Sequence, residues 1–264
     1  MFGMLRSLWH YRSFIISSVR NEFATRFARS RLGGLWMIIH PLVQVAIYAL
    51  ILSNVLSAKL PGIENKYSYA IYLIAGTLAW SLFSEIISRC LNLFIEHGNL
   101  MKKMRFPRIA LPAIVVGSSV MNYLVLLLAA IVVFLTLRHE LTLYALWIIP
   151  LTFVVLMLSL GIGLILGVLN VFIRDIGQVT PILLQLVYWF TPIVYPENII
   201  PAWAQQALSF NPLYPIVRGY HDALVYGSAP DIAQLTYIAL CSFMLLLLGL
   251  FMFRRASAEM VDAL

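Results

Sequence analysis

Apolar residues recur along the chain in six long runs that are separated by short polar segments. The runs cover residues 34–56, 69–95, 110–137, 143–173, 176–195 and 232–253. Each is long enough to cross a bilayer as a helix, which takes about 20 mostly apolar residues. Continuous stretches such as 124–128 and 245–248 do not show the alternation of a transmembrane barrel. The pattern therefore predicts an all-α membrane protein with six transmembrane helices over residues 34–253, in a single domain.

The first 33 residues lack the apolar core of a cleavable signal peptide and predict an amphipathic helix. At helical spacing, one side carries Leu5, Leu8, Trp9, Ile15, Ile16, Val19, Phe23 and Phe27. A basic helix with such a face lies flat in the membrane interface. We expect residues 1–33 to form a cytoplasmic interface helix, which serves either as a topological anchor or as a docking surface for a partner or anionic lipid.

The segment between the last two spans is apolar but cannot form one continuous helix. Residues 198–217 contain no charge, yet Pro201, Pro212 and Pro215 interrupt them. Proline breaks or kinks helices, and free backbone groups cannot face lipid. The segment predicts short re-entrant or interfacial helices between spans five and six, on the outer side.

Composition and charge agree with a membrane location. Hydrophobic residues make up 62% of the chain and charged residues 11%, against about 25% charged in soluble domains, which excludes a soluble enzyme. The net charge is +7, but the basic residues lie between apolar runs, so we expect no nucleic-acid partner. Thirteen Lys and Arg residues fall on one side of the predicted spans and four on the other. This bias places both termini, including the tail 254–264, in the cytoplasm.

The chain lacks the motifs of most enzymes. No glycine is followed by lysine, so there is no P-loop for ATP. The five histidines are scattered without ligand spacing, and Cys90 and Cys241 lie in apolar runs, as small buried hydrophobic residues do. We therefore expect no catalytic residue, metal site or bound cofactor in this chain.

Two features inside the spans have local explanations and functional alternatives. Glu85 and Arg89 are four residues apart on one helix face. They predict an internal ion pair, or else a polar contact near the cytoplasmic mouth of a pathway. Gly161, Gly163 and Gly167 allow close helix contact, either within the bundle or between subunits.

Four blocks of the chain, taken together, resemble the type-2 ABC exporter permeases. They lie at 23–42, 102–112, 172–196 and 211–215. In that family the first span opens with LG-x-x-W-x-x-x-x-P, which is matched here by Leu32, Gly33, Trp36 and Pro41. The blocks extend from one end of the chain to the other. Within the family they are most similar to the permeases for lipid-linked O-antigen and teichoic acid.

The resemblance implies half of a transporter of the bacterial inner membrane. Two copies of this chain would form the pore, and two copies of a separate ABC ATPase subunit would bind ATP and Mg. The cargo would be a polysaccharide on undecaprenyl pyrophosphate. The alternatives are an exporter of drugs or non-glycan lipids and, from another class, a membrane scaffold or an ATP-independent channel.

The resemblance and the basic residues together suggest two cytoplasmic sites. The expected contact with the ATPase subunit is made by Lys102, Lys103, Arg105, Phe106 and Arg108, unless these charges only orient the spans. The residues expected to attract the carrier pyrophosphate are Arg26, Arg29 and Arg31, since the arginine fork suits phosphate. Contact with ordinary anionic lipid is the alternative for them.

Aromatic residues gather where the resemblance places the pathway. They are Trp36, Tyr48, Tyr188, Trp189, Tyr195, Trp203 and Tyr214. Amphipathic rings could line a wet route for a glycan, or could form an ordinary interfacial belt. Tyr48 and Tyr188 lie deeper in their spans, so we expect them to face the pathway between two subunits.

Overall fold

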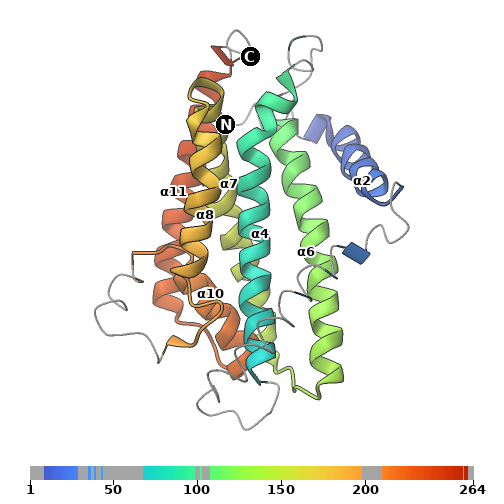
Figure 1. The fold of residues 1–264 in the computed structure, drawn as a ribbon, viewed down its shortest axis with the longest axis vertical. Helices are drawn as coiled ribbons and strands as arrows, with labels where there is room; N and C mark the ends of the chain where they lie inside the picture. The colour runs from blue at the N-terminus through green and yellow to red at the C-terminus, as the bar shows by residue number, and fades with distance from the viewer. Residues whose placement is uncertain are drawn as a thin grey trace.

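A computed structural model of the chain forms a bundle of helices (Figure 1). It describes residues 9–28, 35–36, 39, 43, 68–98, 102, 108–197, 208, 210–257 and 259–260. These residues form helices and turns. In chain order the elements are α2 (Arg12–Ala28), α4 (Ser68–Glu96), α6 (Ala110–Thr136), η1 (Leu143–Trp147), α7 (Ile148–Phe172), α8 (Asp175–Trp189), α10 (Tyr214–His221), η3 (Asp222–Tyr226) and α11 (Ile232–Ala256).

Four helical segments are long and apolar enough to cross a membrane. They are α4, α6, η1 continued by α7, and α11. Their bounds agree with the predicted spans 69–95, 110–137, 143–173 and 232–253, and the all-helical prediction is confirmed for the described residues. The predicted first span, 34–56, lies outside the described residues except at scattered positions. The count of six spans therefore stays a prediction.

The predicted fifth span, 176–195, is too long. Helix α8 has 15 residues and ends at Trp189, which corresponds to about 22 Å of helix against about 30 Å of hydrocarbon. The reason is Pro192, which has no N–H to continue the helix and disfavours a helical Thr191 before it. The chain turns after Phe190 instead of continuing to residue 195.

Two tyrosines of α4 bond the backbone carbonyls in this turn. The Tyr72 hydroxyl lies 2.9 Å from the Pro192 carbonyl oxygen and 3.2 Å from that of Tyr195. The Tyr69 hydroxyl donates to the Val194 carbonyl. Backbone polar groups that are buried need partners within the protein. The start of α4 thereby stabilises the non-helical chain that follows α8.

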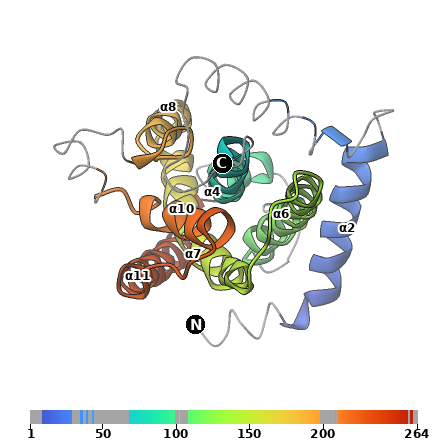
Figure 2. The same ribbon diagram turned by 90° about the horizontal axis from the view of Figure 1, so that it is seen from below.

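Helix α7 packs against both α4 and α11, and Figure 2 shows it between them. A Cβ atom on Gly161 would lie 2.7 Å from the backbone of Leu245 in α11. A Cβ on Gly167 would overlap the carbonyl oxygen of Cys90 in α4. These glycines therefore pack within the chain, as the first of the two interpretations predicted.

Helix α2 lies along the flank of α6, away from α8 and α11 (Figure 2). Only part of the apolar face that the sequence predicted turns toward the bundle. Val19 packs against Gly117 of α6, so closely that a Cβ atom on that glycine would lie 2.9 Å from the Val19 side chain. Trp9 and Ile16, in contrast, are 72% and 65% exposed. The predicted apolar face is thus divided, because tertiary contact selects residues around Val19 and leaves Trp9 and Ile16 uncovered.

Candidate functional site

Two polar clusters with charged side chains lie among the described residues, and the first is centred on Arg89 in α4. The Arg89 guanidinium lies 2.6 Å from a Glu22 carboxylate oxygen in α2 and 3.5 Å from that of Glu85, one turn earlier in α4. It also donates to the Ser118 hydroxyl of α6 at 2.6 Å. The side chain amide of Asn122 donates to Glu85 at 2.6 Å. One arginine therefore links three helices.

The geometry of this cluster suits attachment better than ion transport. All its charged members already have partners within 4 Å, and two carboxylates share one guanidinium. The side chains of Arg89 and Glu22 are 21% and 26% exposed, so water screens the pair only in part. We interpret the cluster as the joint that holds the N-terminal helix against α4 and α6.

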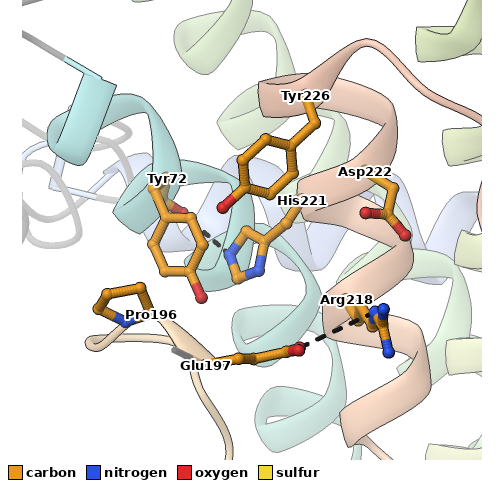
Figure 3. A pocket seen from close by; sticks show the side chains of 7 residues that line it. All are labelled: Tyr72, Pro196, Glu197, Arg218, His221, Asp222 and Tyr226. Carbon is orange, nitrogen blue, oxygen red and sulfur yellow. Dashed lines mark hydrogen bonds and ion pairs between the residues drawn. The ribbon is translucent and has the colours of Figure 1, made fainter. Parts of the chain in front are cut away.

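The second cluster surrounds a cavity of about 210 Å³ at the opposite end of α4 from its C-terminus. This end of the bundle is the predicted outer side. The residues that line the cavity are Tyr72, Pro196, Glu197, Arg218, His221, Asp222 and Tyr226 (Figure 3). They come from the start of α4, the segment after α8, and the junction of α10 with η3.

An ion pair closes one side of the cavity. The Arg218 Nε atom lies 4.0 Å from a Glu197 carboxylate oxygen. These two residues are the charged neighbours of the uncharged segment 198–217, so the pair joins its two ends. Asn211 supports the same region, because its side chain amide lies 2.7 Å from the Thr191 hydroxyl just after α8.

The floor of the cavity is a stack of two rings. The His221 imidazole lies parallel to the Tyr72 ring, with centroids 3.7 Å apart. Its Nε2 lies 3.1 Å from the Tyr72 carbonyl oxygen and so carries the proton in this contact. Complete burial lowers the pKa of His221 to about 3, and the ring is therefore neutral at physiological pH.

Asp222 lies beside this floor at the start of η3. Burial raises its pKa to about 6, against the opposing effect of Arg218, while Glu197 and Asp231 raise it further. The carboxylate therefore exchanges its proton close to neutral pH. Within the described part of the chain, no group of three or more His, Cys, Asp or Glu side chains is arranged to hold a metal ion.

Comparison with known proteins places the chain in a family. Residues 14–225 match the family described as ABC-2 type transporter. The chain belongs to the ABC-2 type transporter family. It is 25% identical to the O-antigen export system permease protein RfbA of Myxococcus xanthus over 100% of both chains. It is also 27% identical to the polysialic acid transport protein KpsM of Escherichia coli, over 92% of this chain and 93% of that one.

The expected docking surface of this ABC-2 protein is described only in part. Lys102 is exposed, and the Arg108 guanidinium donates to the Ser257 carbonyl just after α11. Lys103, Arg105 and Phe106 lie outside the described residues. Arg108 thus joins the start of α6 to the end of α11, at the end of the bundle where α4 also ends (Figure 1).

The arginines expected to bind pyrophosphate are not placed. Arg26 belongs to α2, but its side chain is not described, and Arg29 and Arg31 lie outside the described residues. Their proposed role stays a prediction.

The expected pathway aromatics occupy different surroundings. Tyr188 is 9% exposed, and its ring packs edge-on against Trp80 of α4 at 5.1 Å. Its neighbour Trp189 is 50% exposed and accepts, through its carbonyl, a hydrogen bond of 2.6 Å from the Tyr195 hydroxyl. Trp36 is exposed, and Tyr214 lies beside Glu197 and Arg218. Tyr48 and Trp203 lie outside the described residues.

Sequence reasoning missed both the outer cavity and the part of Glu22 in the Arg89 cluster. Glu22 is 67 residues from Arg89, so no local spacing could join them. The cavity had one signal in the sequence: opposite charges at Glu197 and Arg218 flank a long uncharged segment. Tyr72 and His221 gave none, since their stack depends on how α10 packs against α4.

Proposed function

We propose that the chain is the membrane permease subunit of an ATP-driven exporter that moves a polysaccharide out of a bacterial cell. The observation that carries this proposal is the similarity to an O-antigen export permease over 100% of both chains. The similarity to a polysialic acid transport protein extends the cargo class from O-antigen to polysaccharides. The four long apolar helices fit a membrane subunit.

The rest of the assembly is part of the same proposal. Two copies of this chain form the pathway in the inner membrane, with both termini in the cytoplasm. Two copies of an ABC ATPase subunit bind ATP and Mg and drive it, and the cargo is carried on undecaprenyl pyrophosphate. The absence of a P-loop sequence supports a separate ATPase, and the thirteen-to-four charge bias supports the orientation.

The test is removal and restoration of the gene in its native host. Cells without the chain should lose surface polysaccharide and accumulate the lipid-linked glycan inside, and the wild-type chain should reverse both effects. A tagged chain should purify with an ATPase whose inactivation produces the same accumulation. Normal surface polysaccharide in the deletion strain would contradict the proposal.

A further inference from the structure

We propose that the cavity at the outer end of α4, between Tyr72, Glu197, Arg218, Asp222 and Tyr226, binds a single neutral or amino sugar unit. This inference rests on the proposed export function and names the class of sugar that the chain recognises as cargo leaves. It concerns residues outside the aromatic set expected from the sequence.

The polar side chains around the cavity match the groups of a sugar ring. Carboxylates accept hydrogen bonds and a guanidinium donates several in a planar fork, so both can bind neighbouring hydroxyls in pairs. Glu197, Arg218 and Asp222 supply these groups on one side of the cavity (Figure 3). The Glu197 and Arg218 side chains remain 33% and 44% exposed despite their ion pair, so a ligand can reach them.

Aromatic rings provide the flat surface that the apolar face of a sugar needs. Tyr226 is 43% exposed, and in Figure 3 its ring stands beside the buried stack of Tyr72 and His221. The stack is rigid, because Tyr72 is bonded to the turn after α8 and His221 to α4. Because the floor is already ordered, binding loses less conformational entropy.

The size of the cavity limits the ligand to one ring. Sites for drug-sized molecules enclose about 300–1,000 Å³, whereas this cavity encloses about 210 Å³. A cavity of this volume suits a single sugar unit better than an oligosaccharide. The rest of a polymer would extend from the open side of the cavity.

The charge of the cavity selects against acidic sugars. Among the described residues that line it, Glu197 and Asp222 supply two negative charges, and Arg218, which already pairs with Glu197, supplies one positive charge. An excess of negative charge repels a carboxylate or phosphate and attracts an ammonium group. Neutral and amino sugars should therefore bind, and sialic or uronic acids should not.

Saturation-transfer NMR on the full chain with its ATPase in nanodiscs tests this inference. The probes are methyl glucoside, glucosamine, N-acetylneuraminic acid and phosphoethanolamine at pH 7.5. The first two should give signals, and Asp222→Asn and Glu197→Gln should each weaken them about tenfold, as expected for the loss of a charged hydrogen-bond partner. Tyr226→Ala should abolish them, while Tyr226→Phe should retain most of the signal. The matched control is Glu140→Gln, since Glu140 is an exposed carboxylate on the same predicted outer side.

The outcomes separate this inference from the export proposal. Sugar signals that the Asp222 and Glu197 variants leave unchanged would overturn the cavity as a sugar site, whatever the export result. A signal from phosphoethanolamine that needs Asp222 would overturn it in favour of a lipid headgroup, and equal binding of N-acetylneuraminic acid would overturn the charge selection. Loss of surface polysaccharide on gene deletion tests export by itself. Export with no sugar binding would leave that function standing and remove this inference alone.

Discussion

The Nη2 atom of Arg89 in α4 lies 2.6 Å from the Oε1 atom of Glu22 in α2. This contact turns a helical ion pair within α4 into a joint between the N-terminal helix and the bundle. If the proposed ATPase subunit binds α2, its movement would act directly on the half of α4 that contains Arg89.

Replacing Arg89 with Ala should loosen α2. The change removes the guanidinium that Glu22 and Glu85 share, at a cost of about 1–3 kcal/mol, below that of a fully buried pair because these side chains are partly exposed. Hydrogen exchange in α2 should become faster while α7 stays protected. Arg20→Ala, an exposed arginine of the same helix, should leave both unchanged, and equal effects from the two variants would refute the joint.

Replacing Tyr72 with Phe should destabilise the turn after α8. The hydroxyl donates hydrogen bonds to the carbonyl oxygens of Pro192 and Tyr195. A buried acceptor left without a hydrogen bond costs about 1–3 kcal/mol of stability. The thermal midpoint of the purified chain in detergent should fall. Tyr144→Phe removes a hydroxyl from a ring that is 45% exposed and should have little effect; if both variants melt alike, the Tyr72 bonds do not stabilise the turn.

Replacing Gly161 with Ala should force α7 away from α11. The new methyl group would lie 2.7 Å from the Leu245 backbone, which cannot give way as a side chain could. Overpacking of this kind costs about 1–3 kcal/mol. The thermal midpoint should drop well below that of Ile149→Ala, a change at a position that is 70% exposed on the same helix. A wild-type midpoint for Gly161→Ala would show that the two helices do not pack so closely.

The two neighbours His221 and Asp222 should affect stability in opposite directions on acidification. The pKa of His221 is lowered to about 3, so below pH 6.5 the unfolded chain binds a proton there that the folded chain does not. The free energy of unfolding therefore decreases as pH falls, and the His221 pKa difference lowers it by about 2 kcal/mol at pH 5. The pKa of Asp222 is raised to about 6, so the folded chain takes up its proton first and gains stability as pH falls through that value.

Thermal midpoints at pH 5, 6 and 7 distinguish the two contributions. His221→Gln, which keeps a donor for the Tyr72 carbonyl, should flatten the loss of stability at acid pH. Asp222→Asn should make the loss of stability at acid pH steeper, because the opposing gain from protonating Asp222 is gone and only the destabilising effect of His221 remains. The same slope in wild type and both variants would contradict the environments described for these groups.

Reversing the charges of Lys103 and Arg105 to Glu should release the ATPase subunit. Both residues belong to a basic loop in the predicted cytoplasmic surface, and opposite charge would repel an acidic docking surface. Co-purification should fall, while cysteine labelling shows the same topology. The matched control reverses Lys59 and Lys66, which lie on the predicted outer side; undisturbed co-purification in the first double variant would remove the docking role.

The sequence determined those features that depend on neighbouring residues. Long apolar runs defined α4, α6, α7 and α11, because a helix buries its polar backbone locally and the bilayer sets its length. The proximity of Glu85 and Arg89 followed from helical spacing for the same reason.

The tertiary structure decided which faces meet. It tied the turn after α8 to α4, where the Tyr72 hydroxyl bonds the Pro192 carbonyl. It brought Glu22 to Arg89 and Glu197 to Arg218, and it assembled a cavity from segments that share no sequence pattern. Such pairs depend on the rotation and packing of whole helices, which hydrophobic periodicity does not specify in a chain that is apolar on every side.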